Sequence, residues 1–221
     1  VAGTFTNTVG DLSATQLITA NGIVWTEGSV TGSPSQSWDI GTDGIHISGG
    51  TFVATSGAFT VAGDWDMTGS GTFTPGTGTV IFDGTSAQLI TSADQAFYSV
   101  QNSNTDASVS ITDKFEINSS GALIINEGST FASAGNDFNH NNGTIINNGT
   151  FEINGDEIFT PSNFTIPGNT RVVGSVLSIS TLDSLDNVEF NPSGSLFTLD
   201  EDIDYIHGDI TIAESVTFDM D

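Results

Sequence analysis

The sequence predicts an all-β protein folded as a right-handed parallel β-helix, a β-solenoid in which each coil holds about 20–22 residues. Short apolar runs recur along the chain at a nearly constant step. Glycine and asparagine fill the gaps between the runs, and both residues accept the left-handed backbone angles that tight corners need. β-Branched and aromatic residues are spread along all 221 residues, whereas good helix formers seldom occur together.

The repeat is clearest in the middle of the chain. The centres of its apolar runs are Leu123, Phe131, Phe138, Ile145, Phe151, Ile158, Phe164 and Val172. The step from each centre to the next is nearly constant, at about seven positions. A coiled-coil heptad does not fit, because glycine and asparagine stand where the flanking charges of a coiled coil would be. Three short strands joined by tight turns fit this step, and together they make one coil of a three-sided solenoid.

The stretch from Gly143 to Phe159 is predicted to form most of one coil. Its runs at 145–146, 151–153 and 158–159 would each supply inward side chains. Stacked corner amides can hydrogen-bond along the axis, and the expected corner residues are Asn141, Asn142, Asn147, Asn148 and Asn154. The alternative is an antiparallel β-sandwich, since Asn-Gly is also a hairpin signal. Three Asn-Gly pairs follow one another closely here, which would leave hairpin strands too short for a stable sheet.

Two parts are expected along the chain. Residues 1–50 are less regular and would form an N-terminal cap or a strand-exchange arm, while residues 51–221 would form the β-solenoid. An open solenoid end is an exposed sheet edge that templates association, and a terminal arm can add a strand to a neighbour. Subunit contacts are therefore predicted near both termini, at Val1, Phe5, Val9, Val216, Phe218 and Met220.

The charge and composition exclude several classes of function. The formal net charge is −25, from 27 acidic residues against two basic ones. Nucleic acid binding and docking on an anionic membrane both need clustered basic residues, so neither is expected. The chain has no cysteine, and it has no apolar run long enough for membrane insertion. The sequence starts at Val1 rather than Met, so either a signal peptide has been removed or the sequence begins within a longer chain. Few lysines, no cysteine and abundant Thr, Ser, Asn and Gly together predict a secreted protein, extracellular or at the cell surface.

One segment carries a family resemblance. The sequence GTFTPGTGTVIFDGTSAQLITSADQAFYSVQ, from Gly71 to Gln101, resembles a module of large bacterial cell-surface and secreted proteins. The same module is matched in the spacing of apolar runs and turn residues by two neighbouring segments, GAFTVAGDWDMTGSGTF and DKFEINSSGALIINEGSTF. The match covers roughly residues 45–160 and departs from the module at 101–103, where the usual apolar strand is thinner. The resemblance implies a β-helical stalk of an adhesin or filament protein.

An enzyme is not expected. A polysaccharide lyase needs a cationic base, but Lys114 and Arg171 would lie nearly three coils apart along the axis. A glycoside hydrolase needs two carboxylates at a set separation. Asp64 and Asp66 would share a strand face, and Asp106 belongs to an Asn-Thr-Asp triplet, but the other motifs of pectin hydrolases are missing.

Other candidate residues are scattered. The histidines His46, His140 and His207 are isolated and are expected at surfaces or corners. Aromatic rings can stack on sugars, but core or corner packing is the simpler interpretation of rings without a shared spacing. The aromatic candidates are Trp25, Trp38, Trp65, Tyr98 and Tyr205.

The most concentrated carboxylates suggest calcium. Hard oxygen ligands suit Ca²⁺, and the candidate ligands are Asp200, Glu201, Asp202 and Asp204. A solvated acidic loop is the simpler interpretation, because no calcium-binding loop motif is present.

These observations together predict an extracellular structural protein. It would be a subunit of a self-assembling filament, stalk or surface layer, and its partner would be another copy of itself, joined head to tail. The alternative is an adhesin stalk or carbohydrate-binding module of a larger surface protein, with glycans as partners.

Overall fold

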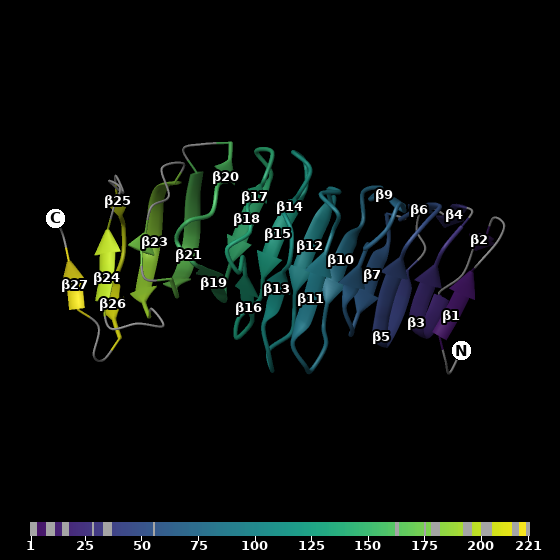
Figure 1. Ribbon diagram of the computed structural model, residues 1–221, viewed down its shortest axis with the longest axis horizontal. Coiled ribbons are helices and arrows are strands. Elements are labelled where there is room, and N and C mark those ends of the chain that lie inside the picture. Colours follow the sequence, from purple (N-terminus) through teal and green to yellow (C-terminus); the bar gives the residue numbers. More distant parts are fainter. Residues whose placement is uncertain are drawn as a thin grey trace.

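The protein is an elongated β-solenoid. The computed structural model describes residues 4–7, 12–14, 18–27, 29–32, 37–54, 56–161, 164–174, 176–177, 182–191, 196–199, 205–213 and 217–219. Within these ranges every regular element is a strand, and every strand pair is parallel. The strands lie side by side along a rod whose two termini are at opposite ends (Figure 1). The predicted fold class is confirmed, and the antiparallel sandwich is wrong.

One wall runs the whole length of the rod. Each of its strands pairs in parallel with the next, so that a single series of neighbours joins the two ends of the molecule. We call it the long wall. Its strands are β1 (Thr4–Asn7), β3 (Ile18–Trp25), β5 (Trp38–Ile47), β8 (Trp65–Asp66), β11 (Gln88–Thr91), β13 (Val109–Ile111), β16 (Thr130–Ala132), β19 (Thr150–Ile153), β21 (Phe164–Val172), β23 (Leu182–Phe190) and β26 (Ile210–Ile212).

A second wall shares the longer strands of the first. The first residues of β3, β5, β21 and β23 belong to it, because these strands continue round a corner with a shift of register. Its remaining strands are β7 (Ala58–Val61), β10 (Thr79–Phe82), β12 (Ser99–Asn102), β15 (Ala122–Ile125), β18 (Thr144–Asn147) and β25 (Tyr205–Ile206).

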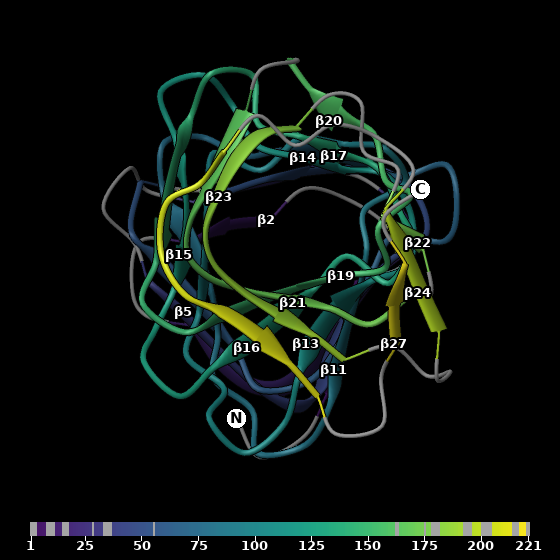
Figure 2. The same ribbon diagram turned by 90° about the vertical axis from the view of Figure 1, so that its left-hand side faces the viewer.

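Three short sheets close the remaining side. They follow one another along the rod, and a view down the axis shows strands enclosing the interior from several sides (Figure 2). The first sheet holds β2 (Leu12–Ala14), β4 (Ser29–Gly32), β6 (Thr51–Val53) and β9 (Thr72–Thr74). The second holds β14 (Phe115–Glu116), β17 (Phe138–Asn139) and β20 (Phe159–Thr160). The third holds β22 (Val176–Leu177), β24 (Leu196–Leu199) and β27 (Thr217–Asp219).

The strand register fixes the length of each coil. Phe131 pairs with Phe151 and Ile90 with Ile111, which agrees with the predicted coil length. The shortest steps in the long wall lead from Thr4 to Gly22 and from Asn169 to Asn187, and the longest leads from Trp65 to Ile90. Each of these steps spans one coil, so turns absorb the variation while the short strands keep their register.

The core is a continuous column of apolar side chains, and aromatic rings run along much of it. Phe97, Phe115 and Phe138 are fully buried, and consecutive rings lie 5.5 and 5.4 Å apart in stacked geometry. Toward the N-terminal end, Trp65 meets Phe97 edge to face at 5.2 Å. Ring contacts of this kind stabilise beyond the area that they bury. From Trp25 to Phe159, rings of one coil therefore pack on rings of the coils next to it.

The corner asparagines bind mainly to backbone. Asn141, with φ of 46°, donates from Nδ2 to the carbonyl of Ile117 in the coil before. Asn147 donates from Nδ2 to the carbonyls of Pro167 and Asn169 in the coil after. Direct pairs between side-chain amides also occur, from Asn187 Nδ2 to Asn169 Oδ1 and from Asn104 Nδ2 to Gln88 Oε1, each at 3.2 Å. Among the predicted corner residues, Asn141 and Asn147 thus link coils through their side-chain amides, by satisfying carbonyl groups rather than by stacking on each other.

The N-terminal segment shares the strand pairing of the rest. In residues 1–50, β1, β3 and β5 pair in parallel, and β5 pairs onward with β7 and β8. The role of this segment as a cap or an exchange arm stays a prediction.

Candidate functional site

The C-terminal end of the long wall exposes core positions. Ile153, Val172, Phe190 and Ile212 occupy one row of register partners across β19, β21, β23 and β26. The first three are 0%, 0% and 1% exposed, whereas Ile212 is 46% exposed. The side chain that completes the row is therefore half open to solvent.

A second row ends in the same way. Phe151, Thr170, Val188 and Ile210 are register partners in the same four strands. Val188 is 2% exposed and Ile210 is 57% exposed. In the described part of the chain, β26 pairs with β23 on one side only. Within the described residues no strand pairs with its other edge, which lies beside two exposed isoleucines; an open edge of this kind recruits a further strand. We call Ile210, Ile212 and the free edge of β26 the end surface.

The end surface differs from the exposed apolar residues on the sides of the rod. Leu89, Ile146 and Ile158 are 45%, 42% and 54% exposed. Leu89 alternates with buried Gln88 and Ile90 in β11, and Ile146 pairs with Ile124 of the preceding coil. Leu89 lies in a strand that is paired on both sides, and Ile158 directly precedes β20, the last strand of its three-stranded sheet. Each is a single exposed residue rather than the end of a buried row, and scattered apolar residues of this kind are normal on protein surfaces.

The predicted subunit contacts only partly fall where they can be described. Phe5 lies in β1, in register with Ile23, at the first strand of the long wall. Phe218 lies in β27, in register with Phe197. Val1, Val9, Val216 and Met220 lie outside the described residues. Sequence reasoning missed Ile210 and Ile212, although the alternation Ile-Thr-Ile was the available signal.

The calcium candidates cannot be placed. Asp200, Glu201, Asp202 and Asp204 all lie outside the described residues. In the ranges that are described, no group of three or more His, Asp or Glu side chains is arranged to hold a metal ion.

The tryptophans belong to the core. Trp25, Trp38 and Trp65 are 1%, 2% and 0% exposed, and each packs against phenylalanine rings. Their rings are not available for stacking on a sugar. The interpretation of these residues as core packing is confirmed.

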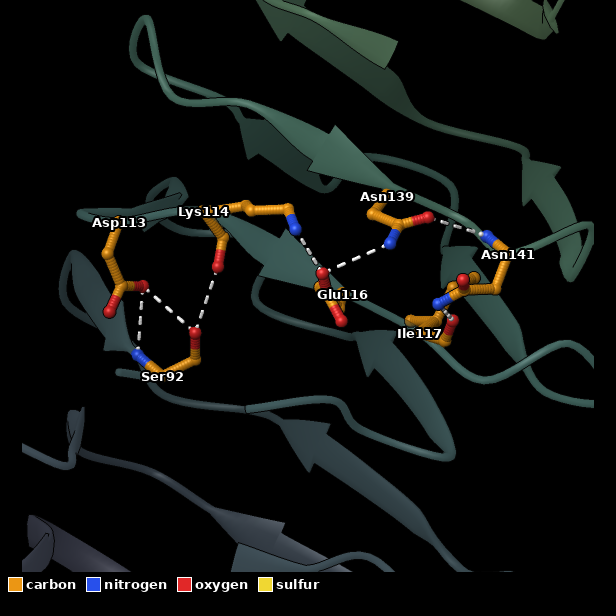
Figure 3. Close-up of polar contacts among 7 residues, drawn as sticks. All are labelled: Ser92, Asp113, Lys114, Glu116, Ile117, Asn139 and Asn141. Atoms are coloured by element: carbon orange, nitrogen blue, oxygen red, sulfur yellow. Dashed lines mark hydrogen bonds and ion pairs between the residues drawn. The ribbon is translucent and has the colours of Figure 1, made fainter. Parts of the chain in front are cut away.

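Lys114 belongs to a polar ladder between coils (Figure 3). Its Nζ donates to Glu116, which also accepts from Asn139 Nδ2 at 3.0 Å. Burial raises the pKa of Glu116, but the hydrogen bonds from Lys114 and Asn139 outweigh it and hold the pKa below its usual value. In the same ladder, Asp113 accepts from the backbone N and the hydroxyl of Ser92 at 2.9 and 3.0 Å. These hydrogen bonds fix the turns, and the Lys114 ammonium is paired with Glu116.

Arg171 is held in the same manner. It lies between Glu152 and Glu189, its register partners on either side, and its Nη1 and Nε donate to them at 3.1 Å each. Two hollows of about 360 and 320 Å³ are lined in part by Arg171. Asp106 lines the smaller hollow. An arginine paired on both sides stabilises neighbouring strands and is not a free base.

The remaining catalytic candidates also hold backbone. Asp64 Oδ1 accepts from the backbone N of Leu89 at 2.8 Å, and Asp66 Oδ1 accepts from that of Thr68 at 2.8 Å. His46 Nδ1 donates to Asp66 Oδ2 at 2.8 Å. Burial raises the pKa of Asp66, but its hydrogen bonds with Thr68 and His46 together outweigh burial and hold the pKa below its usual value. These carboxylates act as braces between coils.

The other two histidines lie at corners. His140 follows β17 and is buried. Burial lowers its pKa, and this effect outweighs the hydrogen bonds with Pro161 and Gly143, which raise the pKa. His207 is exposed, with Nδ1 at 3.5 Å from Asp186 Oδ1.

Comparison of the chain with protein-family models, with curated proteins and with solved structures gave no match. No helix in the described ranges is long and apolar enough to cross a membrane.

Proposed function

We propose that the protein is an extracellular structural protein, a rod-forming segment of a filament, stalk or surface layer that associates through the ends of its solenoid. The observation that carries this proposal is the end surface. Core rows that are buried in the preceding coils end in Ile210 and Ile212, which are more than two-fifths exposed. An exposed core row is completed by a further coil.

The physical properties of the sides of the rod support the same function. Backbone hydrogen bonds run from coil to coil along the axis, and the apolar core is continuous beneath them. The formal charge of −25 makes the sides of neighbouring rods repel each other. Growth along the axis is therefore favoured over lateral clumping.

The origin of the next coil separates two forms of the proposal. In a filament or layer, the next coil comes from another copy of the chain. In a stalk, it belongs to the same polypeptide. The resemblance of residues 71–101 to modules of bacterial cell-surface and secreted proteins supports both forms, and it supports an extracellular location.

Immunoelectron microscopy tests the function and the location together. Antibodies raised against the purified chain are applied to intact, unpermeabilised cells of the source organism and to material shed into its medium. We expect label on the cell surface or along rods or fibres outside the cell. Label that appears only after the cells are permeabilised would contradict the proposal.

A further inference from the structure

We propose that β26 of one molecule binds β1 of a second copy, so that the long wall continues from molecule to molecule. This inference rests on the end association in the proposed function and names its partner and its contacts. The first observation is topological. β1 and β26 are the first and last strands of the same wall, joined by an unbroken series of parallel pairs.

The directions of the strands select a head-to-tail contact. All the pairs in the long wall are parallel, so a β1 strand placed beside β26 by stacking two rods in line is also parallel to it. In the described part of the chain, β1 pairs with β3 only, and β26 with β23 only. Among the described residues, each strand thus has one edge without a partner, and the two strands lie at opposite ends of the rod (Figure 1).

The rows predict the register of the contact. Phe5, Ile23, Ile45, Trp65, Ile90 and Ile111 are successive register partners. The next pairs are Ser110–Ala132 and Ala132–Glu152, and one residue further along each strand they bring Ser133 and Ile153 into the same row as Ile111. From Ile153 the row continues across the following strands and ends at Ile212. A second copy docked in the same row places Phe5 beside Ile212 and Thr4 beside Thr211.

The charge distribution opposes the alternative contact between two C-terminal ends. Acidic side chains crowd the segment 200–221, whereas Asp11 is the single acidic side chain in the segment 1–26. Two C-terminal ends would bring like charges together, and like charges repel most strongly at low salt. A head-to-tail contact sets the acidic end against one that is nearly uncharged.

Two charge substitutions test the end surface. Sedimentation velocity of the purified chain across a concentration series, in moderate salt, measures association. We expect assemblies that grow with concentration, and we expect Ile212→Asp and Ile210→Asp each to weaken association at least tenfold. Ile158→Asp is the matched control, because Ile158 is equally exposed but lies away from the end surface; it should associate like the parent chain. A chain that is monomeric at every concentration, or one in which Ile158→Asp weakens association as much as Ile212→Asp, would overturn the proposal.

Cysteine cross-linking tests the register without relying on a destabilising change. The chain has no cysteine, so Thr4→Cys and Thr211→Cys each introduce a single thiol. Under oxidation, a mixture of the two variants should give disulfide-linked dimers, and Thr211→Cys alone should give none. Dimers formed by Thr211→Cys alone would show contact between C-terminal ends and overturn the proposal. Surface label on cells without these cross-links would leave the structural function standing and refute this contact alone.

Discussion

The middle coils and the last strand of the long wall use the same residue type with opposite results. Ile153 and Ile212 stand in one row of register partners, yet Ile153 is fully buried and Ile212 is 46% exposed. The difference lies in what covers them, since β19 has paired strands on both sides, whereas the described residues pair with β26 on one side. In this solenoid, a core side chain is buried by the coils on both sides of it. Stability and assembly therefore depend on the same contact.

The largest expected effect is the loss of a ring from the middle of the core. Phe115 is fully buried and packs against Phe97, Phe131 and Phe138. Phe115→Ala should lower the free energy of unfolding by about 3–5 kcal/mol, because a cavity remains between coils on both sides. Urea denaturation followed by circular dichroism measures the change. Ile158→Ala, at an exposed position, is the control and should cost far less; equal losses would contradict the packing described above.

A buried carboxylate comes next. Glu157 is 2% exposed and accepts hydrogen bonds from the backbone N of Asn154, Gly155 and Asp156, at 2.6, 2.8 and 3.1 Å. Glu157→Ala should destabilise the fold by about 2–4 kcal/mol, since buried donors lose their acceptor. The neighbouring Asp156 is exposed, so Asp156→Ala is a matched control with little expected effect. If the thermal midpoints of the two variants coincide, Glu157 does not hold this turn.

Two glycines separate backbone strain from crowding. Gly168 has φ of +74°, and a Cβ there would lie 2.2 Å from the carbonyl O of Asn147 in the preceding coil. Gly128 has φ of +79°, but its nearest neighbour would be a methyl carbon of Thr105 at 3.6 Å. Gly128→Ala should cost about 1 kcal/mol for strain alone, and Gly168→Ala should cost about 1–2 kcal/mol more. Equal costs would show that the coils are not in close contact at Asn147.

The smallest expected effect is on pH dependence. Burial holds the pKa of His140 below its usual 6.5. As the pH falls, this histidine is therefore protonated at a higher pH in the unfolded chain than in the folded one. Stability should therefore decline as the pH drops below about 6.5. Glu116 and Asp66 have lowered pKa values, and the stability that they add above their ordinary pKa is lost as the pH falls through the lowered values. Asp83 opposes this trend, because burial and the nearby Asp39 raise its pKa.

His140→Gln isolates the upper part of this profile. The variant should show a flatter thermal midpoint between pH 7 and pH 5 than the parent chain. A parallel profile in both proteins would remove His140 as a source of acid sensitivity.

The sequence predicted the parallel coils because the short, regular step and the Asn-Gly corners are local features. It did not predict which side of each run faces the core. Ile146 and Ile158 belong to apolar runs but are exposed, while Phe151 and Phe159 in the same coil are buried. The polar residue Gln88 is 1% exposed and donates from Nε2 to the carbonyls of Val61 and Gly63 in the preceding coil. Such contacts depend on the register between coils, which is set by turns whose lengths vary along the rod.

The sequence did not predict the end surface either, because it too depends on how the strands of successive coils pair. The predicted contacts Val216, Phe218 and Met220 lie near the C-terminus in sequence. Ile210 and Ile212 are exposed because they occupy the last strand of the long wall. The position of a residue within the wall, rather than its distance from the terminus, determines what covers it.

The most direct test of this account compares Ile153→Ala with Ile212→Ala in the monomer, at a concentration too low for association. The same methyl groups are removed from the same row, so the difference in unfolding free energy reports what the neighbouring coils contribute. We expect Ile153→Ala to lower the unfolding free energy by about 2–5 kcal/mol and Ile212→Ala by under about 1 kcal/mol. Equal losses at the two positions would show that β26 is already covered, and the open end on which the proposed assembly depends would not exist.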